Sequence, residues 1–105
     1  MELFAAKKRG EKDFKIDEIV ISCTLEDIEK IISFLTYARD SLYQEKILPH
    51  NDVIKLDKKI IYPHCHYRDW DLNWKEKNPD IILITPLQAV LKENGETEWV
   101  DIENE

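Results

Sequence analysis

The residues best suited to chemistry lie together in one segment, residues 62–71. It contains two of the three histidines and one of the two cysteines, in the order Tyr62-Pro63-His64-Cys65-His66-Tyr67-Arg68-Asp69-Trp70-Asp71. On a β-strand, His64 and His66 project to the same side because side chains alternate. Two imidazoles so placed could bind a transition metal, with Asp69 as a third ligand and His50 or Asp71 as further ones. The local spacing fixes only two of the four ligands that a structural zinc site needs.

The same segment also suits recognition of a protein. A strand over residues 59–67 leads Tyr62, His64, His66 and Arg68 onto one face, and Pro63 places this strand at a sheet edge or a bulge. Tyr, Trp and Arg are enriched at binding hot spots. We therefore expect a protein-recognition surface rather than a metal site, composed of Tyr62, His64, His66, Arg68, Asp69, Trp70 and Trp74. The alternative is structural: both tryptophans cover the core edge and the histidines are solvated.

Other site chemistries fit the sequence poorly. Residues 69–73 match the first half of a calcium loop, but Trp74 stands at the sixth position, where glycine is needed, and Asp80 stands at the twelfth in place of glutamate. Cys65 points away from its neighbouring histidines on a strand, so no cysteine–histidine pair forms locally. Gly10 and Gly95 stand alone, which excludes phosphate-binding glycine loops. We expect no cofactor.

Length and composition indicate one small acidic domain spanning residues 1–105. The chain has 15 Lys and Arg against 22 Asp and Glu, a formal net charge of −7. This charge disfavours nucleic-acid binding, which depends on cationic side chains. The apolar runs are too short to cross a membrane, and the start lacks the pattern of a secretory signal. We therefore expect a cytoplasmic protein in which Cys23 and Cys65 are buried, reduced thiols.

The most regular predicted element is an amphipathic helix from Leu25 to about Glu45. Thr24 and Asp27 form a capping-box-like start. Apolar residues then recur at three- and four-residue steps and define one stripe: Leu25, Ile28, Ile31, Ile32, Leu35, Ala38 and Leu42. We expect this stripe to dock on a sheet, with Tyr37 on the opposite side of the helix.

Strands are predicted on both sides of the helix. Residues 2–8 and 14–23 indicate an N-terminal hairpin around Gly10, with Ile19-Val20-Ile21 in an interior position. Residues 80–85 indicate a short, buried, wholly apolar strand. Together with residues 59–67 they favour a sheet that the helix covers.

The segment of residues 86–93 has two interpretations. Thr85-Pro86 is typical of a helix start, whereas Asn94-Gly95 predicts a two-residue hairpin turn. We favour the hairpin because Trp99 and Val100 need a partner strand, and the nearest one is adjacent in sequence. From about residue 101 we expect an acidic, frayed tail.

Three motifs resemble a known group of small bacterial proteins. They are a strand that enters a Thr-capped helix, the histidine segment and the start of an apolar strand: Ile21-Ser22-Cys23-Thr24-Leu25-Glu26-Asp27, His64-Cys65-His66-Tyr67-Arg68-Asp69 and Asp80-Ile81-Ile82-Leu83. Over residues 16–85 this pattern is similar to that of the immunity proteins of polymorphic-toxin systems. The resemblance implies a cytosolic α+β protein without catalysis, whose protein partner is a toxin domain that it binds and blocks. The Lys-rich start and residues 99–105 have no counterpart in the pattern.

These observations together predict an α+β fold: a four- to six-stranded, largely antiparallel sheet with one long helix packed on one face. We expect a non-catalytic binding protein whose acidic charge suits a basic protein partner. The alternative from another class is a metal-dependent enzyme or sensor that uses the His-x-His strand motif of His64 and His66 with an aspartate. A third interpretation is a regulatory or structural module without a ligand.

Overall fold

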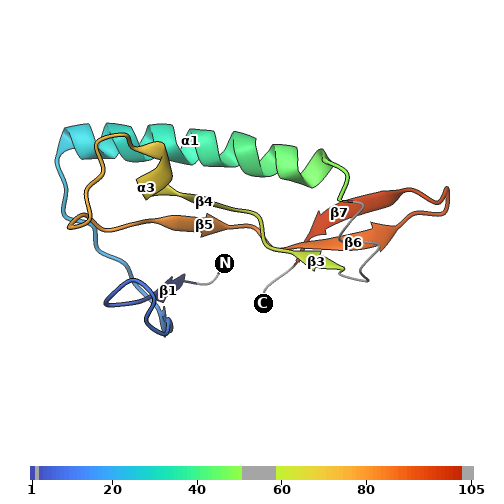
Figure 1. Ribbon diagram of the computed structural model, residues 1–105, viewed down its shortest axis with the longest axis horizontal. Coiled ribbons are helices and arrows are strands. Elements are labelled where there is room, and N and C mark those ends of the chain that lie inside the picture. Colours follow the sequence, from blue (N-terminus) through green and yellow to red (C-terminus); the bar gives the residue numbers. More distant parts are fainter. Residues whose placement is uncertain (2, 51–58, 103–105) are drawn as a thin grey trace.

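The computed structural model describes residues 1, 3–50 and 59–102, and it confirms the α+β class (Figure 1). One long helix, α1 (Leu25–Ile47), lies along the molecule, and a single-turn helix, α3 (Tyr67–Trp70), lies between it and the strands. The described strands form three small sheets, paired as β1–β2, β4–β5 and β3–β6–β7. The sheets are therefore smaller than the four- to six-stranded sheet that the sequence predicted.

Helix α1 begins where the sequence predicts. Thr24 Oγ1 accepts the backbone N–H of Asp27 at 3.1 Å, and Asp27 Oδ2 accepts the backbone N–H of Thr24 at 3.1 Å. This reciprocal pair is a complete capping box. The helix has 23 residues and is about 35 Å long at 1.5 Å per residue. It is long enough to contact both β4 and β7.

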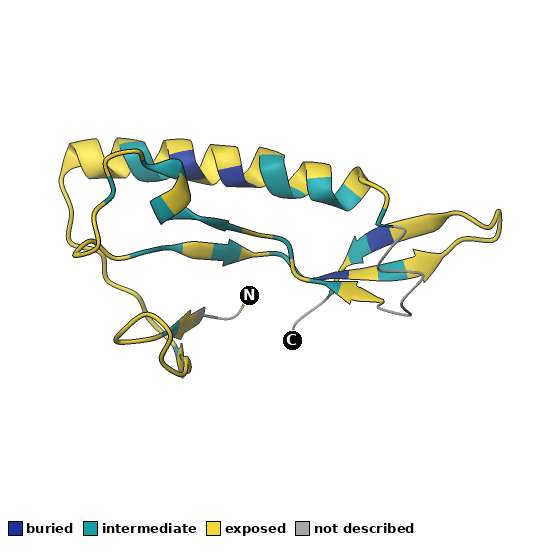
Figure 2. Cartoon of the chain, viewed as in Figure 1, coloured by how far each residue is buried: buried dark blue, intermediate teal, exposed yellow. Residues whose placement is uncertain are grey.

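The buried face of α1 overlaps the predicted stripe only in part (Figure 2). Ala38 belongs to both. Phe34 and Ala38 are fully buried, and Phe34 meets Tyr67 of α3 edge-on with ring centroids 5.2 Å apart. Four residues that the sequence assigned to the docking stripe are exposed: Leu25, Ile28, Ile32 and Leu35. At 100° per residue, the buried face is turned by roughly 80° from the centre of that stripe. Phe34 is buried because its ring packs on the aromatic rings of α3. The predicted stripe was based on aliphatic residues and did not include it.

A bent two-stranded ribbon positions the histidine segment. β3 (Ile60–Ile61) leads into β4 (His64–His66), and β5 (Ile82–Ile84) leads into β6 (Leu87–Leu91). Both halves keep one register, since Ile61 pairs with Leu87 and His64 pairs with Ile84.

Two prolines interrupt this ribbon: Pro63 between β3 and β4, and Pro86 between β5 and β6. Thr85 donates its N–H to Pro63 O at 3.0 Å, but Pro63 has no N–H to donate in return. The strand predicted over residues 59–67 is thus split at Pro63 and ends where Tyr67 begins α3. Of the two places predicted for Pro63, a sheet edge or a bulge, the described strands confirm the edge, because β3 and β4 are both edge strands among them.

The C-terminal segment is the hairpin that the sequence favoured, and the helical alternative for residues 86–93 is wrong. β6 pairs antiparallel with β7 (Thr97–Asp101). The loop is one residue longer than predicted, because Lys92 N–H donates to Glu96 O at 2.8 Å and Gly95 N–H donates to Lys92 O at 3.0 Å. Gly95 has φ +85°, the left-handed conformation that closes a three-residue loop of this kind.

Pairing with β7 stops at Pro86, whose carbonyl accepts the N–H of Ile102 at 3.2 Å. Over the described residues, the outer edge of β5 therefore has no partner strand. Ile82 and Ile84 are 49% and 56% exposed, so the predicted burial of this strand is wrong. Of the predicted acidic tail, Asp101 belongs to β7, and residues 103–105 lie outside the described residues.

The N-terminal hairpin is confirmed but is shorter than predicted. β1 (Leu3–Ala5) pairs antiparallel with β2 (Phe14–Ile16). Ile16 already pairs with Leu3, the first residue of β1, so residues 17–23 lie past the end of the ladder. Ile19, Val20 and Ile21 are accordingly 60%, 81% and 52% exposed, which contradicts the predicted interior strand.

The described core is small and the molecule is elongated. The buried apolar residues in the described ranges are Phe34, Ala38, Leu87 and Trp99. The chain measures 51 × 26 × 24 Å with a radius of gyration of 16.4 Å, whereas a compact domain of this length has about 13 Å. Across residues 3–50 and 59–102, no helix has the length and apolar character needed to cross a membrane.

Candidate functional site

His64 and His66 lie side by side on β4, as the strand alternation predicted. Their ring centroids are 5.1 Å apart at an interplanar angle of 74°. His64 Nδ1 lies 3.1 Å from Tyr62 O, and His66 Nδ1 lies 2.7 Å from Asp80 Oδ2. A carbonyl and a carboxylate only accept hydrogen bonds, so each Nδ1 has the proton and donates it. Within residues 1, 3–50 and 59–102, neither Nε2 atom makes a hydrogen bond.

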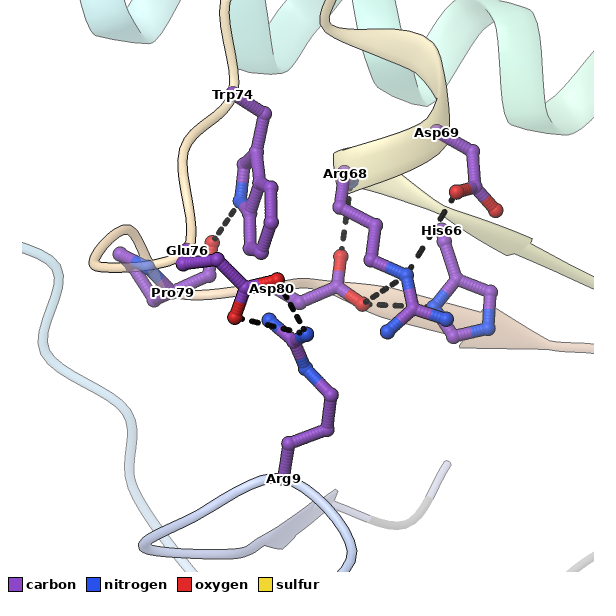
Figure 3. A network of polar contacts seen from close by, with 8 residues as sticks. All are labelled: Arg9, His66, Arg68, Asp69, Trp74, Glu76, Pro79 and Asp80. Atoms are coloured by element: carbon purple, nitrogen blue, oxygen red, sulfur yellow. Dashed lines mark hydrogen bonds and ion pairs between the residues drawn. The ribbon is translucent and has the colours of Figure 1, made fainter.

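Asp80 connects the segments around the histidines, and the sequence did not single it out as a site residue (Figure 3). Its Oδ1 accepts the backbone N–H of Arg68 at 3.0 Å, and its Oδ2 lies 3.8 Å from Arg68 Nε. The side chains of Asp80 and His66 are 13% and 17% exposed. Burial acts to raise the pKa of Asp80, but the hydrogen bonds from His66 and the Arg68 backbone outweigh it and lower that pKa overall. Asp80 lies just before β5, so its ionised carboxylate connects the start of that strand with His66 of β4 and Arg68 of α3.

Arg68 belongs to α3 and not to the strand that carries the histidines, although it lies close to the same Asp80 oxygen as His66. The chain turns at Tyr67, whose N–H donates to Ile81 O at 2.9 Å, and Asp71 N–H then donates to Tyr67 O at 2.9 Å. This turn leaves Arg68 Nε 3.6 Å from Asp69 Oδ1 as well as close to Asp80. The Arg68 side chain is 31% exposed, so its guanidinium acts mainly within the molecule.

The two tryptophans occupy different places. Trp70 is half-buried and packs on Phe34, with ring centroids 5.7 Å apart. Trp74 donates its Nε1–H to Pro79 O at 3.0 Å, and the Arg9 guanidinium lies 5.0 Å from its ring centroid (Figure 3). Arg9 comes from the loop between β1 and β2, so Trp74 contacts the N-terminal hairpin instead of the histidines.

A shallow hollow lies between β4 and α1, and we call it the β4 hollow. One part has a volume of about 190 Å³ and the adjoining part about 410 Å³. Five of the seven predicted recognition residues line it: Tyr62, His64, His66, Asp69 and Trp70. Tyr37 of α1 lines both parts and was not predicted to do so. Its position three residues after the buried Phe34 is the signal, because residues three apart share a helix face.

The ligands proposed for a metal site are only partly brought together. Across the described ranges, no three His, Cys, Asp or Glu side chains are grouped to hold a metal ion. His50 lies elsewhere, with its ring centroid 4.9 Å from that of Trp99. Asp71 Oδ1 accepts the backbone N–H of Asn73 at 3.0 Å, which is the local turn expected if the segment is not a calcium loop. His64, His66 and Asp69 do line the same part of the β4 hollow.

Neither cysteine is in a disulfide, as predicted. Cys65 lines the β4 hollow and is half-buried. Burial raises the pKa of its thiol, and Glu45 raises it further. A protonated thiol is a poor nucleophile, so Cys65 has the character of a packing residue. Cys23 is exposed, which contradicts its predicted burial and follows from the absence of a strand at residues 17–23.

Comparison with known proteins finds no matching family model, no matching curated protein and no matching solved structure. The similarity to toxin immunity proteins therefore remains a prediction from the three sequence motifs. The β4 hollow is the structural feature on which a function can be based.

Proposed function

We propose that this chain is a non-catalytic, cytoplasmic binding protein that recognises a protein partner at the β4 hollow. In line with the resemblance in sequence, the partner is a toxin domain and binding blocks its activity. The observation that supports this function best is the gathering of Tyr37, Tyr62, His64 and Asp69 around one open hollow.

The composition of the hollow suits a protein interface. Tyr37 and Tyr62 are 50% and 62% exposed, and tyrosine supplies a large contact area at a small cost in side-chain entropy. The histidines next to them are held by Tyr62 O and Asp80. A surface whose side chains are already fixed loses less entropy on binding.

The charges at the hollow favour a basic partner. The side chains of Asp69 and Glu45 are 71% and 43% exposed at its border, and the whole chain has a net charge of −7. Opposite charge on a partner would accelerate association and orient the encounter. A basic toxin domain fits this pattern.

The test compares two tyrosines of equal exposure. Tyr62 lies at the hollow and Tyr43 lies on α1 outside it, and each is 62% exposed. A protein captured by the wild-type chain from its native cells would be purified and its Kd measured by calorimetry. Tyr62→Ala should weaken binding at least about 30-fold, or about 2 kcal/mol, while Tyr43→Ala leaves it unchanged.

The toxin assignment has its own readout. Expression of the captured protein alone should arrest growth, and co-expression of the wild-type chain, but not of Tyr62→Ala, should restore it. Equal Kd values for the two tyrosine variants would contradict the β4 hollow as the binding surface. Binding without any effect on growth would leave a binding protein of another kind.

A metal-dependent enzyme or sensor is the second candidate, based on His64, His66 and Asp69. It is favoured by one observation: both Nδ1 atoms donate to fixed acceptors, the arrangement that orients metal-binding histidines and leaves Nε2 for the ion. Elemental analysis of the purified full chain separates the two candidates. Stoichiometric zinc or another transition metal, lost in the His64→Ala, His66→Ala double variant, would replace the binding proposal.

A further inference from the structure

The smaller part of the β4 hollow is lined mainly by aromatic rings and hydrogen-bond acceptors. Its volume is about 190 Å³. Tyr37 and Trp70 line it, next to the two imidazoles of His64 and His66 and the carboxylate of Asp69. Among the lining residues that the structure describes there is no lysine or arginine. The complementary ligand for this part therefore supplies hydrogen-bond donors and positive charge.

The hydrogen bonds of the two histidines determine what they offer to a ligand. His64 Nδ1 donates to Tyr62 O, and His66 Nδ1 donates to Asp80 Oδ2. When one nitrogen of a neutral imidazole has the proton, the other is an acceptor, so each Nε2 accepts. The rings are held with their centroids 5.1 Å apart. Two acceptors fixed in this way, beside a carboxylate, suit a ligand with several N–H groups.

Asp69 keeps the capacity to bind a cation. Its side chain is 71% exposed, and its Oδ1 lies 3.6 Å from Arg68 Nε, which is longer than a hydrogen bond. The same Nε lies 3.8 Å from Asp80 Oδ2, so one guanidinium is shared between two carboxylates. A carboxylate has about four acceptor positions. Arg68 therefore neutralises Asp69 only in part.

The larger part of the hollow, with a volume of about 410 Å³, suits the stem of a long side chain. Leu42, Tyr62 and Pro63 line it, and methylene groups can pack on such surfaces while the charged end of the side chain stays with polar groups. Glu45 lines the same part. Burial raises the pKa of the Cys65 thiol and the charge of Glu45 raises it further, so this negative charge acts within the hollow.

We propose that the β4 hollow binds a guanidinium group, which the partner presents as an arginine side chain. This inference rests on the proposed function, because it names the chemical group by which the protein partner is recognised. A guanidinium is planar, has five N–H donors and no acceptor, and stacks on aromatic faces. A lysine ammonium is a strongly hydrated point charge, so it matches the separate acceptors and rings less well.

Blocked amino acids test the chemistry of the site on the full chain. Nα-Acetylarginine amide should shift the NMR signals of the Tyr37 and His64 rings in a saturable manner. The citrulline analogue has the same shape without the charge and should bind at least about tenfold more weakly. The lysine analogue should also bind more weakly than arginine. No saturable shift with arginine, or equal binding of arginine with either analogue, would overturn the guanidinium site.

Matched variants locate the bound group. Tyr37→Leu and Asp69→Asn should each weaken the binding of blocked arginine at least about tenfold. Tyr43→Leu and Asp40→Asn, on α1 outside the hollow, are the controls, since Tyr43 and the Asp40 side chain are 62% and 67% exposed. Asp69→Asn alters an exposed side chain, so it remains informative if Tyr37→Leu fails to fold. Equal effects of Asp69→Asn and Asp40→Asn would mean that general surface charge attracts arginine, and would overturn the site.

The captured partner provides the final test. Alanine replacement of its exposed arginines should identify one whose loss weakens binding at least about 30-fold, and this loss should be non-additive with Asp69→Asn in a double-mutant cycle. If no arginine behaves in this way while Tyr62→Ala still weakens the complex, the inference is wrong and the proposed function stands. If blocked arginine binds but no captured protein depends on Tyr62, the proposed function is wrong and the guanidinium comes from a small molecule.

Discussion

Asp80 is the residue on which the geometry of the histidine segment depends most. It receives the His66 ring, the Arg68 backbone and the Arg68 side chain, although it lies 14 residues from His66 in sequence. A half-buried carboxylate with this many donors is favoured as the anion. Its removal would leave the His66 and Arg68 donors without their acceptor.

Asp80→Asn should therefore lower the free energy of unfolding by about 1–3 kcal/mol at neutral pH. The folded-state pKa of Asp80 lies below its ordinary value of 3.8, so its contribution is complete above about pH 4 and is lost as pH falls through the lowered pKa. Urea unfolding at neutral and acid pH measures this difference. Asp69→Asn is the control, because its side chain is 71% exposed. The same loss from Asp80→Asn at pH 7 and well below pH 4 would contradict the ionic role.

The two thiols should differ in reactivity with a thiol reagent. Cys23 is exposed, whereas Cys65 is half-buried and burial raises the pKa of its thiol. Native protein should label rapidly at one site and slowly at the other, and both should label rapidly in denaturant. Mass spectrometry of the labelled peptides assigns the sites. Fast labelling of Cys65 in the native state would mean that the β4 hollow opens further than the structure indicates.

At the scale of the elements, the most direct test asks which face of α1 packs against α3. Phe34→Ala removes a fully buried ring that contacts Tyr67 and Trp70, so it should cost about 3–5 kcal/mol of unfolding free energy. Ser33→Ala, at the exposed neighbouring position, should stay within about 0.5 kcal/mol. Chemical denaturation of the three proteins gives both values. Similar small losses would place another face of α1 against α3.

Local signals in the sequence predicted the ends of elements well. The Thr24 and Asp27 capping box lies within four residues, and both side chains make the expected bonds. The pair His64 and His66 also follows from strand alternation alone. The Asn94-Gly95 turn signal correctly indicated a hairpin, because glycine readily adopts the positive φ that Gly95 has in this loop.

Features that depend on distant parts of the chain could not be predicted. The helix pattern gives an apolar face but not what lies opposite, so Ile32 was assigned to the sheet and Phe34 was missed. Asp80 lies next to His66 because β4 and β5 pair with His66 opposite Ile82 and the chain turns at α3. Tyr37 lines the hollow for the same reason that Phe34 is buried: this face of α1, and not the predicted one, is turned toward β4 and α3.

At the scale of the whole molecule, α1 links parts that share few other contacts. Near its middle Phe34 packs on α3, and near its end Lys46 Nζ lies 3.0 Å from Asp101 Oδ2 of β7. The contacts of the N-terminal hairpin with the rest include those of Arg9 with Trp74 and Glu76. Its stability should thus be largely separate from that of the remainder.

Arg9→Ala tests this separation. The Arg9 and Glu76 side chains are 47% and 88% exposed, so their ion pair contributes little, and the ring contact adds about 0.5–1 kcal/mol. We expect hydrogen exchange to accelerate in residues 3–16 while global unfolding changes by less than about 1 kcal/mol. Lys12→Ala, in the same loop, should change neither. Unchanged exchange in the hairpin after Arg9→Ala would mean that other contacts hold it.

Among the described strands, the outer edge of β5 has no partner, and this affects the solubility of the purified protein. Its exposed isoleucines, Ile82 and Ile84, sit beside backbone groups that a strand from another molecule can bond. Mutual repulsion opposes such encounters at neutral pH, but it vanishes near the isoelectric point of about 5.0. Light scattering should therefore rise within about half a unit of pH 5, and Ile84→Lys, which places a charge on the edge, should suppress the precipitation without altering the melting temperature.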